Sequence, residues 1–298
     1  MAKELIVGVD IGGTNIRVGT VDSDIQLSRE EIISSRKLQG ENSVYTLLDY
    51  LKAYISSGDA APIALSFGFP STIDKERHTV INTPNLKGFN NVKIKSIYEE
   101  ALGIPVYINK DATALLYCDM HRLGIKNSGT VVGIYVGTGI GNSIIINGNE
   151  YVGNDGVACE LGHIPVSGRD DPCSCGLKGC IELYAGGKML ERIWEEEFRE
   201  TPLENLFAVH SAASRVREYI TDVANAIATE INILNPGHVV LGGGVLQMKS
   251  FPKELLKDIV LDKTRRPIPR DRINIVFSDG GNPYNGVIGA ALFGFAEK

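Results

Sequence analysis

The chain has 298 residues, 43% of them hydrophobic and 22% charged, which is typical of a soluble globular protein long enough for two domains and not of a disordered one. A formal net charge of −6 and the absence of a basic stripe argue against nucleic acid or an anionic membrane as a partner. The first residues do not resemble a signal peptide, and no apolar run approaches a membrane span, so we expect a cytoplasmic protein with reduced thiols.

The first predicted element is a hairpin that begins at Val7, in the stretch VGVDIGGTNIRVGTVDSD. Two β-rich apolar runs flank a glycine turn, and a polar turn follows. Beyond it, strands and helices are predicted to alternate. In chain order they are a helix over 43–56, a strand over 63–69, a helix over 92–102, a strand over 105–108 and a helix over 111–123.

A second hairpin of the same pattern begins at Val132, in VGIYVGTGIGNSIIINGN. Few residues are identical between the two hairpins, so the repeat is one of pattern, and two glycine hairpins can also be similar by chance. The elements predicted after it are helices over 187–199, 211–234, 252–261 and 285–295, and strands over 239–241 and 273–277. This alternation predicts an α/β protein. We expect a first domain over 1–115, completed by the last helix at about 285–298, and a larger second domain over 116–284.

The first glycine turn has residues suited to phosphate binding. Backbone N–H groups at glycines can approach an anion closely, and the side chain of Asp10, at the strand end, could hold Mg²⁺. A plain hairpin turn is the alternative. The expected nucleotide-binding residues here are Asp10, Gly12, Gly13, Thr14 and Asn15.

Two further glycine runs are candidates for the nucleotide site. The turn in the second hairpin occupies the position that matches the first, which suggests two loops around a polyphosphate in a cleft between domains. The run after the strand HVVL leaves room for a flat group such as adenine, or else for close helix packing. The residues are Gly137, Thr138 and Gly139 in the turn, and Gly242, Gly243 and Gly244 after the strand.

The segments DIGGTNIR, GTGIG, ELGH, CSCGLKGCIE and LGGGV together resemble the ROK group of bacterial sugar kinases, within the actin/hexokinase-like superfamily. The resemblance runs from Val7 to about Leu292. It implies a two-domain, actin-like (RNase H-like) ATPase fold with duplicated hairpin-containing domains and an interdomain cleft. It also implies ATP with Mg²⁺ as the phosphoryl donor, a hexose as the acceptor, and a homodimer or a dimer of dimers.

Asp111 matches the catalytic aspartate of this family. Sugar phosphorylation needs a carboxylate that orients the attacking hydroxyl and accepts its proton. The residue types alone favour a helix N-cap aspartate, and the family resemblance favours the base. The chain departs from the family pattern beside this residue, because Lys110 and Thr113 stand where asparagines are usual, and this leaves the identity of the sugar open.

The resemblance also implies a set of sugar-binding residues. Amide and carboxylate side chains can bond adjacent sugar hydroxyls, and a glycine lets backbone approach the sugar. The implied set is Gly68, Asn85, Asp111, Glu160, His163 and Glu182.

One histidine and three cysteines near Glu182 form a candidate metal site. His163, Cys173, Cys175 and Cys180 are an accepted ligand set for tetrahedral structural zinc, although their spacing alone is only moderately specific. A disulfide is disfavoured by the expected compartment and by the odd number of thiols. The family resemblance favours Zn²⁺. Cys118 and Cys159 lie outside the set, and Cys118 is expected to be a small buried hydrophobe.

The stretches GVACELGHIP, LGGGVLQMKSFPKEL, RRPIP and YNGVIGAAL most resemble family members that phosphorylate D-allose. They favour transfer to the 6-hydroxyl of D-allose, with N-acetylmannosamine or glucose as the alternatives. A sugar-responsive transcription regulator is a further alternative. Such regulators have an N-terminal DNA-binding domain, for which the predicted first strand leaves no room.

Overall fold

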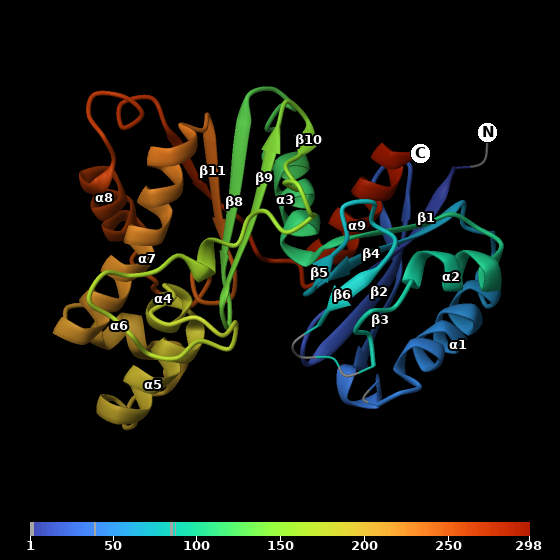
Figure 1. Ribbon diagram of the computed structural model, residues 1–298, viewed down its shortest axis with the longest axis horizontal. Coiled ribbons are helices and arrows are strands. Elements are labelled where there is room, and N and C mark those ends of the chain that lie inside the picture. Colours follow the sequence, from blue (N-terminus) through green and yellow to red (C-terminus); the bar gives the residue numbers. More distant parts are fainter. Residues whose placement is uncertain (1–2, 39, 84–85, 87) are drawn as a thin grey trace. The chain divides into compact units, whose positions relative to one another are not determined.

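A computed structural model describes residues 3–38, 40–83, 86 and 88–298 (Figure 1). The chain forms two compact units, each of which combines separate stretches of sequence. The first unit comprises Met1–Lys126, Val152–Ala158 and Gly281–Lys298. The second unit comprises Asn127–Tyr151 and Cys159–Gly280.

A five-stranded sheet forms the centre of the first unit, in the order β3-β2-β1-β4-β7. Strands β1, β2 and β3 are antiparallel, whereas β4 and β7 run parallel to β1. The bounds are β1 Leu5–Ile11, β2 Asn15–Asp22, β3 Leu27–Ser34, β4 Ala64–Phe69, β5 Thr72–Ile73, β6 Val80–Asn82, β7 Val106–Lys110, η1 Ser35–Leu38, α1 Ser43–Ser56, α2 Ile94–Leu102, α3 Asp111–Arg122 and α9 Asn285–Glu297.

The second unit repeats this topology with a sheet in the order β10-β9-β8-β11-β12. Again an antiparallel hairpin is extended by parallel strands beside its first strand. The bounds are β8 Thr130–Val136, β9 Ile140–Ile146, β10 Asn149–Glu150, β11 His238–Gly242, β12 Asn274–Phe277, η2 Leu161–His163, α4 Glu182–Ala185, α5 Gly187–Glu197, η3 Leu203–Asn205, α6 Leu206–His210, α7 Ser214–Leu234 and α8 Lys253–Lys263. The predicted α/β fold with duplicated hairpin-containing units is confirmed.

Helix α9 packs within the first unit because glycines allow very close approach. A Cβ on Gly289 would lie 1.7 Å from the carbonyl oxygen of Ala114 in α3, and one on Gly8 would lie 2.3 Å from that of Val287. The hydroxyl of Ser66 in β4 donates to the Ala290 carbonyl at 2.5 Å. Helix α3 packs on α9, and the first unit extends to residue 126, whereas the sequence prediction places the end of the first stretch at residue 115.

Each unit has its own hydrophobic core around its sheet. Cys118 is fully buried between α9 and the first sheet, as expected for a small hydrophobe.

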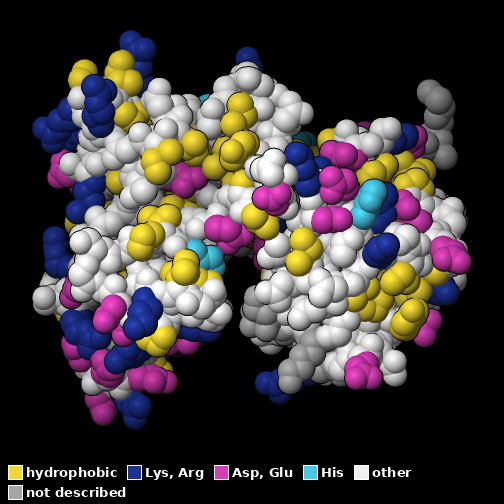
Figure 2. All heavy atoms as spheres, viewed as in Figure 1, with side chains coloured by type: hydrophobic (Ala, Val, Ile, Leu, Met, Phe, Trp, Pro, Cys, Tyr) yellow, Lys and Arg dark blue, Asp and Glu magenta, His cyan; other side chains and the backbone are white. Residues whose placement is uncertain are grey.

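Lysine and arginine side chains gather on the surface over α8 and the segment after it (Figure 2), where Arg266 and Arg270 both pair with Asp262. Within the described part of the chain, no helix combines the length and apolar character that crossing a membrane requires.

Candidate active site and metal centre

The first glycine turn joins β1 to β2, and its carbonyl groups are bonded to neighbouring donors. Gly12 N–H donates to the Asn15 carbonyl at 2.9 Å, which closes the turn. The Ser35 hydroxyl donates to the Gly12 carbonyl at 2.6 Å, and Ser35 N–H donates to the Thr14 carbonyl at 2.9 Å. Partial negative charge on these oxygens is thereby neutralised, which favours the approach of an anion to the turn.

The carboxylates of Asp10 and Asp111 in the first unit are both partly buried, and the negative charge of Asp10 acts on Asp111. Burial, and then the negative charge of Asp10, raise the pKa of Asp111 to about 7. Burial likewise raises the pKa of Asp10 to about 6, although the Arg17 guanidinium, 3.6 Å away, opposes the rise. Two oxygen-donor groups that resist simultaneous ionisation form a suitable environment for Mg²⁺, because a divalent cation would stabilise both charges.

Local packing fixes the position of both carboxylates. Asp111 is the first residue of α3 and follows the N-cap residue, Lys110, so it is not the N-cap itself; its Oδ1 accepts from Ala112 N–H at 2.7 Å. Gly68, at the end of β4, lies against this helix start, since a Cβ there would be 3.4 Å from the Asp111 Cα. A Cβ on Gly286 would lie 2.4 Å from the Asp10 carboxyl carbon, so the first turn of α9 supports Asp10.

Lys110 and Thr113, the two residues that depart from the family pattern, are both held by contacts in the first unit. Lys110 Nζ donates to the Ala158 carbonyl at 2.8 Å, within the first unit. Thr113 is 1% exposed in α3. Asn85, the expected sugar-binding amide, lies outside the described residues.

The second glycine turn joins β8 to β9 and is held by the start of α5. Gly187 N–H donates to the Gly137 carbonyl at 2.8 Å, and Lys188 N–H donates to the Thr138 carbonyl at 3.2 Å. Gly137 N–H donates to the Gly139 carbonyl at 3.0 Å. As in the first turn, bonded carbonyls favour an anion at the remaining face of the loop.

The third glycine run follows β11 and divides into two kinds of position. Gly243 has φ +93, and a Cβ there would lie 2.4 Å from the Val136 carbonyl oxygen. A Cβ on Gly242 would lie 2.7 Å from the Tyr135 ring. These two glycines therefore allow close packing on β8. At Gly244, by contrast, a Cβ would have no atom within 4 Å among the described residues beyond its two neighbours in the chain.

The four expected metal ligands come together in the cysteine loop (residues 163–182). One donor atom from each of His163, Cys173, Cys175 and Cys180 lies within 4.8 Å of all the others. Cys173 Sγ is 3.7 Å from His163 Nδ1, and Cys175 Sγ is 3.6 Å from Cys180 Sγ. Tetrahedral zinc with Zn–S bonds of about 2.3 Å places its ligand atoms roughly 3.6–3.8 Å apart, so this donor set fits Zn²⁺.

Electrostatics of the thiols agree with a cation site. Burial raises the pKa of Cys180 to about 12, and the adjacent Cys175 and Cys173 sulfurs add to the rise because a second negative charge in the cluster is unfavourable. A divalent cation removes that penalty. The fifth cysteine, Cys159, is outside the cluster and its Sγ lies 3.5 Å from the Tyr151 carbonyl oxygen.

The expected sugar-binding residues of the second unit differ in their surroundings. His163 presents Nδ1 to Cys173, while its Nε2 lies 3.9 Å from the half-exposed Glu160 carboxylate. Glu182 instead bonds the second glycine turn, because its Oε2 accepts from Ile140 N–H at 2.9 Å. Sequence reasoning did not predict this bond, since no local pattern connects positions 140 and 182.

Sequence reasoning also missed a polar cluster that holds the cysteine loop. The Arg169 guanidinium lies 3.0 Å from the Asp222 carboxylate of α7 and 4.2 Å from the centre of the Tyr184 ring. The Tyr184 hydroxyl in turn donates to Asp171 Oδ2 at 2.7 Å. The charged run RDD (residues 169–171) before Cys173 was the only sequence signal for this cluster.

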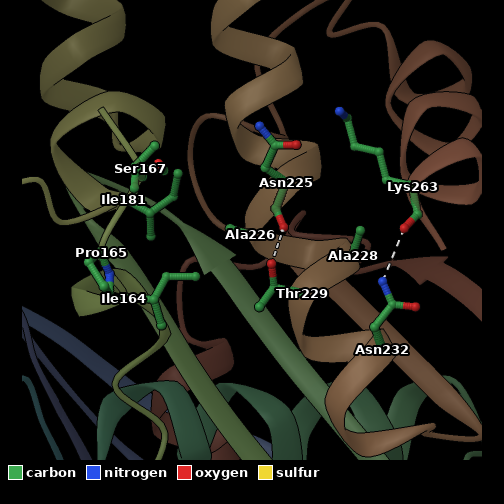
Figure 3. A pocket seen from close by; sticks show the side chains of 11 residues that line it. Ile164, Pro165, Ser167, Ile181, Asn225, Ala226, Ala228, Thr229, Asn232 and Lys263 are labelled. Atoms are coloured by element: carbon green, nitrogen blue, oxygen red, sulfur yellow. Dashed lines mark hydrogen bonds between the residues drawn. The ribbon is translucent and has the colours of Figure 1, made fainter. Parts of the chain in front are cut away.

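A cavity of about 350 Å³ lies in the second unit between the cysteine loop and α7 (Figure 3). Ile164 and Ile181 line one side, and Asn225 and Thr229 of α7 line the other. The Thr229 hydroxyl donates to the Asn225 carbonyl at 2.8 Å, so this polar group is bonded within its own helix. Among the described residues that were expected from the sequence to bind sugar or nucleotide, none lines this cavity.

Known proteins resemble this chain over almost its whole length. A glucokinase of Thermotoga maritima is 27% identical over 88% of this chain and 89% of its own. A xylose repressor of Caldicellulosiruptor bescii is 28% identical over 86% of this chain and 69% of its own. A ROK family glucokinase of Streptomyces griseus, solved with glucose and AMPPNP, superposes with a TM-score of 0.75 at 26% identity, covering 96% of this chain and 98% of that one. Residues 6–295 match the ROK family, and the chain therefore belongs to it.

Proposed function

We propose that this protein is an ATP-dependent sugar kinase that transfers the γ-phosphoryl group of ATP to the 6-hydroxyl of a hexose. One observation carries the proposal. Asp111 begins α3 against Gly68 at the end of β4, and burial together with Asp10 raises its pKa to about 7, which suits a base that accepts a hydroxyl proton. The glucokinases among the relatives are in agreement.

Each unit contributes residues with defined roles. Asp111 orients the sugar hydroxyl and accepts its proton, and Asp10 binds Mg²⁺ with the nucleotide. The turn at Gly12, Gly13, Thr14 and Asn15 and the turn at Gly137, Thr138 and Gly139 bind phosphate groups through backbone N–H groups. Gly244 borders the adenine, with Gly242 and Gly243 fixing its backbone. Asn85, Glu160, His163 and Glu182 bind sugar hydroxyls, and Gly68 lets the start of α3 approach the sugar.

The metal ligands act on the sugar site indirectly. His163, Cys173, Cys175 and Cys180 would hold a structural Zn²⁺, and four protein ligands leave no open position for catalysis. Bound zinc would supply rigidity to the loop that ends at Glu182. We further propose that the chain acts as a homodimer or a pair of dimers, as the family resemblance implies.

We propose D-allose as the sugar, with N-acetylmannosamine and glucose as the alternatives. Four sequence stretches, GVACELGHIP among them, support allose. The Lys110 ammonium group donates to the Ala158 carbonyl at 2.8 Å, and Lys110 stands where the family resemblance implies an asparagine that contacts the sugar. A buried polar site rejects a sugar whose hydroxyl points the wrong way, since unpaired groups are costly.

A panel assay tests these proposals. ADP release is measured with D-allose, glucose, mannose and N-acetylmannosamine, and we expect the highest kcat/KM with D-allose. A 6-deoxy analogue of the preferred sugar should bind without turnover. Turnover of the 6-deoxy analogue would disprove transfer to the 6-hydroxyl. Sugar binding without turnover of any hexose would favour a sugar-responsive regulator, the role named for the xylose repressor.

A further inference from the structure

The Glu182 carboxylate lies among three segments of the second unit. Its Oε2 accepts from Ile140 N–H at 2.9 Å, at the end of the second glycine turn. A Cβ on Gly139 would lie 2.1 Å from the same oxygen, and a Cβ on Gly162 would lie 3.3 Å from it. The carboxylate therefore occupies a notch that depends on glycine at positions 139 and 162.

The residues on either side of Glu182 connect this notch to the cysteine loop and to the turn. Cys180, two residues earlier, is one of the four clustered metal ligands. Gly187 and Lys188, a few residues later, donate to the carbonyls of the turn. The short helix α4 (Glu182–Ala185) thus begins beside the metal ligands and ends where the turn is held.

We propose that Glu182 is a positioning residue that links the cysteine loop to the phosphate-binding turn, so that the metal-ordered loop also controls nucleotide affinity. This inference rests on the proposed function, which assigns nucleotide phosphate to the turn. A charge-assisted bond to Ile140 N–H fixes the direction in which the turn presents its remaining N–H groups. The other carboxylate oxygen still has acceptor capacity, so a contact with sugar is compatible with this role.

Binding of AMPPNP with Mg²⁺, measured by calorimetry without sugar, tests the link. Loss of a hydrogen bond to a charged group should weaken AMPPNP binding about tenfold or more in Glu182→Ala. Glu182→Gln keeps an acceptor oxygen and should stay within about threefold of the wild type. Glu191→Ala, at an exposed carboxylate of α5, is the matched control and should bind AMPPNP as the wild type does.

Hydrogen–deuterium exchange provides a readout that does not depend on activity. Exchange at the amides of residues 137–141 should increase in Glu182→Ala and, with Glu182 intact, after removal of metal by a chelator. Neither change is expected in Glu191→Ala. This measurement separates the two proposals, because it reports the bond at Ile140 even if the wild type binds no nucleotide, an outcome that would disprove the proposed function alone.

A double-mutant cycle tests the notch itself. Gly139→Ala places a methyl group on the Glu182 carboxylate and should weaken AMPPNP binding in the wild-type background, but add little to Glu182→Ala. Two results would overturn the inference. One is unchanged AMPPNP affinity and exchange in Glu182→Ala with loss of sugar binding only, and the other is unchanged exchange at 137–141 after metal removal.

Discussion

Replacement of Asp111 by asparagine should abolish catalysis and yet stabilise the protein. Burial and the nearby Asp10 raise the pKa of Asp111 from 3.8 to about 7. Between pH 5 and pH 8 the native carboxyl must lose its proton in an unfavourable environment, whereas the unfolded chain has already lost it. Stability therefore falls as pH rises through this window. Asparagine is close to aspartate in shape and does not ionise.

The magnitude follows from the shift. A rise of the pKa from 3.8 to about 7 corresponds to about 4 kcal/mol of lost stability at pH 8, and more than half of this loss occurs between pH 5 and pH 8. Urea unfolding at both pH values, with the cysteine loop loaded with zinc and with magnesium and nucleotide left out, measures the free energy of unfolding. We expect the stability advantage of Asp111→Asn over the wild type to grow by about 2–3 kcal/mol from pH 5 to pH 8.

Asp59→Asn is the matched control, because Asp59 is an exposed carboxylate in the same unit. Its free energy of unfolding should stay within about 0.5 kcal/mol of that of the wild type, as is usual for an exposed substitution. If the free energy of unfolding depended on pH equally in Asp111→Asn and in the wild type, the raised pKa of Asp111 would be refuted. Near-normal kcat in Asp111→Asn would separately refute its role as the base, which otherwise predicts a loss of at least about 10²-fold.

Three further predictions concern the pH profile, the metal and the polar cluster. In wild type, kcat/KM for the sugar should decrease toward acid pH as Asp111 takes up a proton, with a midpoint below about 7 because Mg²⁺ stabilises the charged form, and an increase toward acid pH would contradict a carboxylate base. Cys175→Ala or chelation should remove bound zinc, weaken sugar binding and lower stability by several kcal/mol, whereas Cys159→Ala should keep the metal, as metal analysis and thermal unfolding would show. Arg169→Met leaves the Asp222 carboxylate without its partner and should lower the free energy of unfolding by about 1–3 kcal/mol. Because burial already raises the pKa of Asp222, the loss should be larger at pH 8 than at pH 5. Adding Asp222→Asn to the same chain should restore most of the lost stability, and no restoration would mean that the ion pair is not the cause.

Sequence patterns determined the regular elements because their signals are local. The helix predicted over 43–56 matches α1, and the two glycine hairpins match β1–β2 and β8–β9. Amphipathic periodicity and glycine turns are encoded within a few residues, so no distant contact is needed to recognise them. The same holds for the candidate metal ligands, because thiolate and imidazole groups are the donor types that a soft cation prefers.

Tertiary structure alone decided the short elements and the long-range contacts. The two-residue strand β5 and the four-residue helix α4 are too short to carry a periodic signal, and they form because their surroundings order them. The bond from Ile140 to Glu182 and the closeness of Asp10 to Asp111 join residues from separate elements. Their chemistry depends on burial and mutual distance, which arise only when the sheet and its helices pack together.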